Sequence, residues 1–246
     1  MASHPGFVGI DVVDLHDPRC VGKSEDGRFL ARVLAEPERD AVGIGPDPDR
    51  VLWRLWAAKE AAFKVITKLR GAPPPFVHAS FRVEPAGTRS GDGFGEVRWE
   101  ELAVRVHWHE LGDRIGAIAW NGPAGPEPIE WGWGAAIELD PAPHEPLETL
   151  ILRLDEQERA PVHSRGSALV RLAARAALAG ALGAEQGRIR VINRAGPKGR
   201  TPPEATLDGR PAPADVSLSH HGRWIAWALR LAEQRPLAAA QGEAAG

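Results

Sequence analysis

The sequence predicts an α+β fold made of two similar lobes, because the second half of the chain repeats the first. Residues 32–42 (RVLAEPERDAV) and 152–162 (LRLDEQERAPV) place a Leu, two Glu and an Arg at matching positions. An alanine-rich helical stretch, a strand-like stretch and a closing alternating strand then follow in each half. The alternative is a coincidence of alanine-rich composition, which the shared order of four elements disfavours. We expect the lobes to pack as an intramolecular pseudo-dimer.

The helix with the clearest start and stop signals is expected over residues 51–69. Asp47-Pro48 or Asp49 can cap its start, and Gly71, followed by three prolines, ends it. The matching helix of the second half is expected over residues 170–182. Apolar side chains at helical spacing are expected on the core-facing side of the first helix: Leu52, Trp56, Phe63 and Ile66.

Strands are expected before and after each helix. Residues 9–15 (GIDVVDL) form an apolar run at the start of the first half. Residues 76–85 and 188–197 are strand-like stretches after the helices, and residues 114–120 (RIGAIAW) and 223–229 (RWIAWAL) alternate as the closing strand of each half.

The boundary between the halves is expected in residues 121–134, which are rich in Pro and Gly. We place the first lobe at 1–122, the linker at 123–133, the second lobe at 134–235 and a disordered tail at 236–246. Tandem copies of one fold commonly pack about a pseudo-twofold axis, as homodimers do. The crevice between the lobes is therefore the default place for a ligand site.

Composition indicates an ordinary globular protein and excludes several classes. The 246 residues suffice for one large domain or two small ones, and the net charge of −3 leaves no overall basic footprint for nucleic acid. A single cysteine, Cys20, excludes internal disulfides and cysteine-based zinc sites. No apolar run approaches the roughly 20 residues that span a bilayer, and the first residues lack signal-peptide features. We expect a cytoplasmic protein with no membrane or nucleic-acid partner.

Two carboxylates and a lysine stand out in the first half. Asp11 interrupts an apolar strand, and Glu60 and Lys64 are four residues apart on one helix face. The simplest interpretation of Glu60 and Lys64 is a surface ion pair worth about 0.3–0.5 kcal/mol. If Asp11 and Glu60 converge, however, they form the hard oxygen site that Mg²⁺ prefers, completed by phosphate oxygens and water.

The second half does not repeat this acidic pair. Alignment of the halves places Ala135 or Ala136 at the position of Asp11, and Ala176 at the position of Glu60. Such asymmetry is expected where one of two pseudo-symmetric clefts retains chemistry and the other does not.

The closing segment of the second half has its own polar signal. In residues 216–229 (VSLSHHGRWIAWAL), Ser219 and His220 at a strand end suit a phosphate group, although a polar turn with an idle histidine is the plain alternative. Upstream, a loop carries Lys198 and Arg200, which could approach a polyanion or simply be solvated. His107, His109 and Glu110 lack a third donor at a convincing spacing for a metal site.

These stretches together resemble the 4′-phosphopantetheinyl transferase superfamily. Residues 9–15 and 56–64 (WAAKEAAFK) resemble its paired acidic motifs, and residues 199–229 resemble its third signature. Residues 28–39 are similar to the compact holo-acyl-carrier-protein synthase branch. The resemblance implies an α+β lobe used as a homotrimer or as a tandem pseudo-dimer, and two joined lobes imply the latter. The motif order is reversed relative to surfactin-type enzymes, which carry the Ser-His motif in their first half.

The resemblance implies an activity and a metal site. Members of the family move the phosphopantetheine arm of coenzyme A onto a serine of an apo carrier protein, use Mg²⁺, and release adenosine 3′,5′-bisphosphate. By this resemblance Asp11 and Glu60 are metal ligands and catalytic residues, and Lys64 is a catalytic residue that contacts the diphosphate. The third acid of the larger members falls on Val13, as in the compact branch, where water fills the position.

The resemblance also assigns the coenzyme A contacts. Ser219 and His220 would hold phosphate groups, and Arg200 would lie near the nucleotide. Asp14 matches no family ligand and is interpreted as a structural or supporting group, while Lys59 could help through its charge.

The implied protein partner is an acidic acyl, peptidyl or aryl carrier protein. Lys23, Arg28 and Arg32 are candidates for its recognition. Two fused lobes make a monomer sufficient. Two other classes stay open at this point: a degenerate homologue that binds coenzyme A or a carrier without transfer, and a purely structural two-lobe protein.

Overall fold

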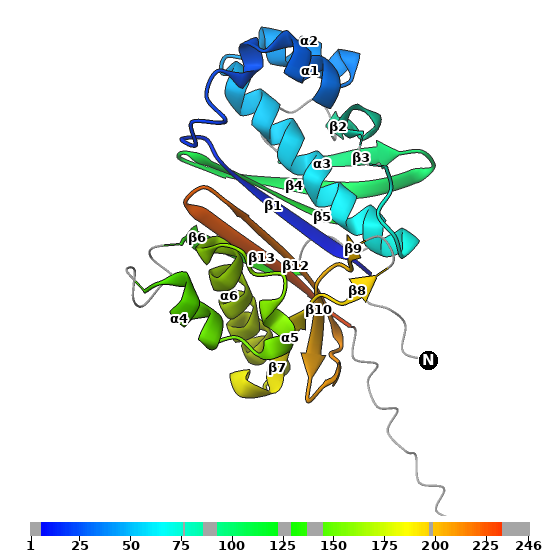
Figure 1. Ribbon diagram of the computed structural model, residues 1–246. Coiled ribbons are helices and arrows are strands. Elements are labelled where there is room, and N and C mark those ends of the chain that lie inside the picture. The colour runs from blue at the N-terminus through cyan, green and yellow to red at the C-terminus, as the bar shows by residue number, and fades with distance from the viewer. Residues whose placement is uncertain are drawn as a thin grey trace, which may run out of the picture.

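The computed structural model describes residues 6–75, 77–85, 93–122, 129–136, 145–196 and 199–232. The predicted tail at 236–246 and Lys198 lie outside these ranges. Figure 1 shows two lobes whose sheets lie between helix α3 (Pro48–Arg70) on one side and helix α6 (Arg165–Leu182) on the other. The α+β prediction is confirmed. Within the described ranges, no helix combines the length and apolar character needed to cross a bilayer.

The first lobe is a five-stranded antiparallel sheet with helices on one face. Its sheet order is β1-β5-β4-β3-β2, and α3 packs against β1, β5 and β4. Its elements besides α3 are β1 (Val8–Asp14), η1 (Lys23–Glu25), α1 (Gly27–Val33), α2 (Glu36–Ile44), η2 (His78–Ser80), β2 (Arg82–Pro85), β3 (Phe94–Trp99), β4 (Leu102–Leu111) and β5 (Arg114–Trp120).

The second lobe repeats the first in a shorter form. Its strands β6, β13 and β12 follow the order of β1, β5 and β4, while β7, β10 and β11 form a separate small sheet. Its elements besides α6 are β6 (Ile129–Ala135), α4 (Leu147–Leu152), α5 (Glu156–Arg159), η3 (Gln186–Arg188), β7 (Ile189–Ile192), β8 (Ala195–Gly196), β9 (Gly199–Arg200), β10 (Glu204–Leu207), β11 (Arg210–Pro211), β12 (Ala214–His221) and β13 (Trp224–Leu231).

Helix α3 lies between the predicted capping residues Asp47 and Gly71, and it begins at Pro48, three residues before the expected range of 51–69. The Asp47 carboxylate accepts the backbone N–H of Arg50 at 3.0 Å, and Gly71 takes the left-handed conformation (φ 67°) that ends the helix. Leu52 and Ile66 are fully buried, whereas the predicted core residues Trp56 and Phe63 are partly buried at its margin. The strand-like stretch at 76–85 is strand only over β2.

Glu38 and Glu158, which the repeat aligns, perform the same structural task in the two lobes. Both are buried, and each accepts the backbone N–H of a strand residue at 2.8 Å, Val83 for Glu38 and Val191 for Glu158. Each also accepts the N–H at the start of its own short helix. The repeat therefore preserves a buried carboxylate that joins a helix turn to the sheet.

A basic side chain on the long helix neutralises each of these carboxylates. Lys59 of α3 donates to Glu38 at 2.5 Å, and Arg175 of α6 donates to Glu158 at 3.2 Å. The Lys59 side chain is 0% exposed and also donates to two backbone carbonyls. The expectation that Lys59 assists the site by its charge is therefore wrong, because its charge is paired in the core.

The strand register corrects one part of the sequence alignment. Asp14 pairs with the first residue of β5, and Ala135 pairs with the first residue of β13. Counted back from these pairs, the counterpart of Asp11 is Gly132 rather than Ala135 or Ala136. The conclusion that the second lobe has no carboxylate here still holds.

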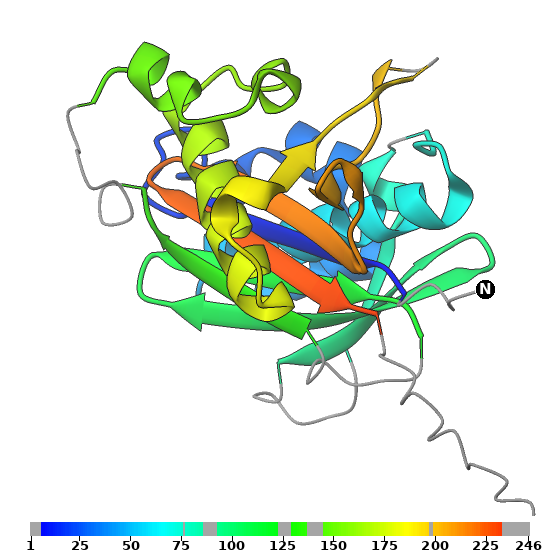
Figure 2. The same ribbon diagram turned by 90° about the horizontal axis from the view of Figure 1, so that it is seen from below.

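The lobes meet along β1, which Figures 1 and 2 both show beside β12 and β13. Val8, Ile10 and Val12 point into an apolar cluster that includes Ala226 and Ala228 of β13. Because side chains alternate along a strand, the intervening residues of β1 face α3 instead. Burial on both faces explains the apolar run that surrounds Asp11.

The second lobe begins earlier than the predicted boundary. Strand β6 starts at Ile129, inside the range 123–133 that the sequence analysis treats as linker, and pairs with β13. Trp131 and Trp133 of this strand pack against the apolar cluster between the sheets. Glycines that usually indicate a loop here alternate with these tryptophans in a strand.

Candidate active site

Asp11 lies on the face of β1 that meets α3, and its carboxylate is largely buried at 8% exposure. Its Oδ1 accepts hydrogen bonds from Lys64 Nζ at 3.0 Å and from Ser219 Oγ at 2.8 Å. Its Oδ2 has no partner among the residues that the structure describes. The carboxylate is thus anchored through one oxygen and leaves the other available.

Glu60 lies close enough to Asp11 for their charges to interact. Burial raises the pKa of the Asp11 carboxyl, the Lys64 ammonium opposes this rise, and the negative charge of Glu60 adds to it. The Glu60 carboxylate has one described contact, a long one of 3.4 Å to the Nε2 atom of His78. Two carboxylates that repel each other and keep free oxygens fit a divalent cation, which would stabilise both as anions.

A pocket of about 310 Å³ brings the predicted acids together with the Ser-His segment. Asp11 and Glu60 line it from the first lobe, and His220 and His221 line it from the second. Among the described residues, no cluster of three or more His, Cys, Asp and Glu side chains could hold a metal. A cation here would therefore have two carboxylate ligands and would need oxygens from substrate and water, as Mg²⁺ does at phosphate sites.

A second pocket of about 350 Å³ lies on the other side of Lys64. Lys64 and Thr67 of α3 line it together with Arg200, Pro202 and Leu218. The hydroxyl of Thr67 is buried and has no hydrogen-bond partner among the described residues. Because unpaired buried hydroxyls are costly, this oxygen suggests a missing polar partner in the pocket.

His220 is a neutral group at the pocket wall. Its ring packs against Gly166 in the first turn of α6, where an added Cβ would lie only 3.1 Å away. Burial lowers the pKa of His220 to about 4, and the neighbouring His163 adds to this effect. Near neutral pH the imidazole therefore offers one N–H donor rather than a positive charge.

Ser219 lies at the site with its hydroxyl already bonded. The O–H group donates to Asp11, and its oxygen accepts the backbone N–H of Val12 at 3.3 Å. Arg200 is exposed and makes one long hydrogen bond, 3.5 Å to the carbonyl of Asn193. Of the predicted residues, Asp11, Glu60, Lys64, Ser219 and His220 lie together, and Arg200 lines the adjoining pocket.

Asp14 stands apart from this group. It is buried and accepts both Nε and Nη2 of Arg223, at 2.9 and 2.7 Å. These hydrogen bonds lower the pKa of Asp14 to about 2. The carboxylate ties the end of β1 to the β12–β13 turn, which agrees with a structural role.

An aromatic surface that sequence reasoning missed borders Glu60. The ring of His78, which contacts Glu60, stacks on Trp56 at 4.3 Å, and Trp56 stacks on Phe29 at 5.9 Å. Lys23 and Arg32 lie over the Phe29 ring, at 5.5 and 5.4 Å. These residues come from three separate segments, so no single stretch of sequence indicates the surface.

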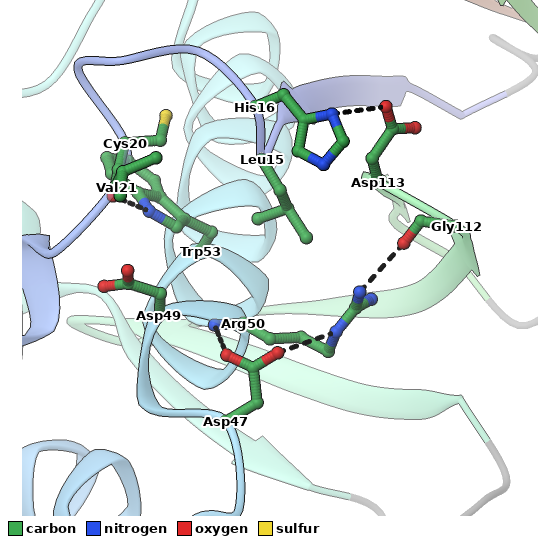
Figure 3. Close-up of a pocket in the computed structure, with 10 residues that line it drawn as sticks. All are labelled: Leu15, His16, Cys20, Val21, Asp47, Asp49, Arg50, Trp53, Gly112 and Asp113. Atoms are coloured by element: carbon green, nitrogen blue, oxygen red, sulfur yellow. Dashed lines mark hydrogen bonds and ion pairs between the residues drawn. The ribbon is translucent and has the colours of Figure 1, made fainter.

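A larger pocket of about 660 Å³ opens beside the first one (Figure 3). Its polar groups are satisfied within the protein: Asp49 accepts two backbone N–H groups, and Arg50 bonds to Asp47 and the carbonyl of Gly112. Burial raises the pKa of Cys20 at its edge to about 12, so this thiol stays protonated. None of the predicted site residues lines this pocket.

Comparison with known proteins found one family model and several solved structures that are similar to part of the chain. Residues 7–119 match the family model described as the 4′-phosphopantetheinyl transferase superfamily. The crystal structure of holo-[acyl-carrier-protein] synthase from Neisseria meningitidis is 17% identical, with a TM-score of 0.37 over 50% of this chain and 100% of that one. The acyl carrier protein synthase of Mycobacterium tuberculosis is 24% identical, with a TM-score of 0.32 over 48% of this chain and 97% of that one.

No curated protein compared with the chain matches it significantly. The family match covers β1 and α3, the elements that carry the acidic pair and its lysine. The first lobe, residues 7–119, therefore belongs to the 4′-phosphopantetheinyl transferase superfamily.

Proposed function

We propose that this chain transfers the 4′-phosphopantetheine arm of coenzyme A to a serine of an apo carrier protein and releases adenosine 3′,5′-bisphosphate. One observation carries the proposal: Asp11, Glu60 and His220, from both lobes, line one pocket, and Lys64 separates it from a cationic groove. Phosphoryl transfer depends mostly on positioning and on electrostatic stabilisation, which this arrangement of charges can supply.

Asp11 and Glu60 are the proposed magnesium ligands. The unpartnered Oδ2 of Asp11 and the weakly bonded carboxylate of Glu60 would bind the ion, with diphosphate oxygens and water completing its coordination. When bound there, Mg²⁺ supplies charge neutralisation at the diphosphate. Val13, which lies where larger members carry a third acid, leaves this set at two carboxylates.

Lys64 is proposed to stabilise the leaving group. Its ammonium bonds to Asp11 and also lines the second pocket, so it lies between the metal ligands and the groove. As the bond between phosphorus and the bisphosphate oxygen breaks, the negative charge that develops there would be met by this ammonium.

The groove beyond Lys64 is the proposed place for the nucleotide half of coenzyme A. Pro202 and Leu218 offer apolar surface for a base, Arg200 offers a cation for phosphate, and the buried Thr67 hydroxyl lacks a partner. On the other side, the neutral His220 would donate one hydrogen bond to a phosphate oxygen. Replacing His220 with Ala is expected to raise KM for coenzyme A more than it lowers kcat at saturation.

The carrier serine is proposed to attack from the side of Glu60. Its oxygen bonds to the phosphorus of the phosphopantetheine group while the bond from this phosphorus to the bisphosphate oxygen breaks. Glu60, or a water molecule that it orients, accepts the serine proton.

An acidic carrier protein is the proposed partner. The aromatic surface next to Glu60 carries Lys23 and Arg32. Arg28 is exposed on helix α1, which also carries Arg32. Negative side chains around the acceptor serine would meet these cations and bring the hydroxyl to the pocket.

Incubation of the chain with coenzyme A, Mg²⁺ and a panel of apo carrier proteins tests the proposal. One or more carriers should gain about 340 Da, the mass of the phosphopantetheine arm, in intact-protein mass spectrometry. The same incubation with EDTA, and with the Asp11→Asn variant, should give no gain. If no carrier gains mass while coenzyme A still raises the melting temperature, the chain binds the nucleotide without transferring its arm.

A further inference from the structure

The outer edge of β1 is closed by side chains of the other lobe rather than by another strand. In antiparallel pairs every second N–H of an edge strand points away from its sheet and needs an acceptor. Four alternate residues of β12 provide these acceptors: Asp215 for Val8 N at 2.7 Å, Ser217 for Ile10 N at 3.0 Å, Ser219 for Val12 N at 3.3 Å, and His221 Nδ1 for Asp14 N at 3.0 Å.

Two lysines of α3 bond to backbone carbonyls of β1 along the same edge. The contacts of β1 with β12 and with these lysines are called the seam below. Lys64 donates to the carbonyl of Ile10 at 2.6 Å, and Lys68 donates to that of Val8 at 2.8 Å. Each lysine also reaches a carbonyl of β12, at 3.4 and 2.7 Å. Strand β1, which carries Asp11, is therefore held along this edge by β12 and α3 together.

Ser219 differs from the other three β12 acceptors of this seam, because its side chain also bonds to Asp11 of the acidic pair. Its hydroxyl donates to Asp11 Oδ1 at 2.8 Å while it accepts the N–H of Val12. A hydroxyl has one proton, so Ser219 cannot donate to Asp11 and to a phosphate oxygen at once. Ser217 is a close match in type and burial, but no hydrogen bond joins it to Asp11 in the ranges that the structure describes.

We propose that Ser219 is a positioning residue that orients the Asp11 carboxylate for the divalent cation, rather than a phosphate ligand of coenzyme A. This inference rests on the proposed function for its cation. With Oδ1 held by Ser219 and Lys64, Oδ2 is the oxygen left for the metal. Both metal ligands come from the first lobe, yet the geometry of one of them depends on a hydroxyl of the second.

Titration with Mn²⁺, followed by electron paramagnetic resonance without coenzyme A or carrier, tests the inference. Ser219→Ala should bind Mn²⁺ about tenfold more weakly than the unaltered chain, because one charge-assisted hydrogen bond to Asp11 is lost. Ser217→Ala is the matched control, because it loses the same kind of N–H acceptor on the same strand. It should bind Mn²⁺ within about twofold of the unaltered chain.

Equal Mn²⁺ affinities for Ser219→Ala and Ser217→Ala would overturn the positioning role, and so would an unaltered chain that binds no Mn²⁺. In a transfer assay, Ser219→Ala should raise the Mg²⁺ concentration needed for half-maximal rate and leave KM for coenzyme A unchanged at saturating Mg²⁺. The opposite pattern, a raised KM with unchanged Mn²⁺ binding, would also overturn it. If the Mn²⁺ series behaves as expected but no carrier is modified, the proposed transfer fails while the positioning role of Ser219 stands.

Discussion

The two lobes share a buried structural acid, but only the first has the acids of the candidate site. Glu38 and Glu158 each accept a strand N–H and a helix-start N–H, and each is neutralised by a basic residue of the long helix. This carboxylate joins helix to sheet in both lobes, so folding alone explains why both copies have it.

The site residues have no such counterpart. Lys59 and Arg175 mark equivalent positions on α3 and α6, so Ala176 replaces Glu60 and Gly180 replaces Lys64. The difference teaches that a lobe of this kind folds without these charges, so the lobe fold alone does not explain Glu60 and Lys64. Lys64 has a further structural role only in the contact between the lobes, where it bonds to backbone carbonyls of β1 and β12.

Removal of the Glu60 charge tests whether this site residue acts independently of the scaffold. It should have the largest effect of the changes considered, and the effect should be on the transfer rate. Glu60→Gln is expected to lower the transfer rate by about a thousandfold, because a metal ligand and proton acceptor is lost. The free energy of unfolding should change by less than about 0.5 kcal/mol, since among the described residues the carboxylate has a single long polar contact. Rate measurements with a modified carrier and urea unfolding check the two parts, and normal transfer by the variant would remove Glu60 from the site.

The structural acids should behave in the opposite way and should match each other. Glu38→Gln leaves the fully buried Lys59 without its counter-charge, and Glu158→Gln does the same to Arg175. Each change is expected to lower the free energy of unfolding by about 3–5 kcal/mol. Urea unfolding monitored by tryptophan fluorescence measures both losses. A loss below about 1 kcal/mol in only one variant would show that the lobes do not use this acid equivalently.

Asp14 links the first lobe to Arg223 of the second, and the second lobe has Ala135 at the equivalent position. The contribution of Asp14 to the free energy of unfolding should depend on pH. Its folded pKa is about 2, against an ordinary value of 3.8, so the charged form stabilises the folded chain. Asp14→Asn should therefore cost about 2 kcal/mol above pH 4, and the difference from the unaltered chain should shrink as the pH falls from 4 to 2. Unfolding free energies of both chains across this range check the sign, and a difference that grows toward low pH would contradict it.

Two glycines of the second lobe stand where the first lobe has site residues, and alanine at these two positions should have opposite effects on stability. At Gly132, the counterpart of Asp11, an added Cβ would lie 2.7 Å from the Trp227 ring, so Gly132→Ala should cost about 1–3 kcal/mol. At Gly180, the counterpart of Lys64, the same atom meets nothing within 4 Å. Gly180→Ala should therefore stabilise the chain by about 0.5–1 kcal/mol through helix propensity. Melting temperatures of the two variants should shift in opposite directions.

Local pattern was sufficient to predict the elements that carry the candidate site. The caps at Asp47 and Gly71, the apolar spacing along α3 and the apolar run of β5 lie within short stretches of chain. Local pattern was insufficient where a charge had two possible partners. Lys59 and Lys64 both lie in the alanine-rich part of α3. Lys59 is paired with Glu38 in the core, whereas Lys64 bonds to Asp11 at the pocket.

The sequence by itself determined the duplicated α+β scaffold, the single acidic pair and the family of the first lobe. Only the tertiary structure decided which polar groups meet across the lobes. The hydroxyl of Ser219 and the carboxylate of Asp11 are 208 positions apart in the chain, yet they form a 2.8 Å hydrogen bond. Such a pair leaves no periodic signal in either segment, because it depends on how two folded sheets align at their edges.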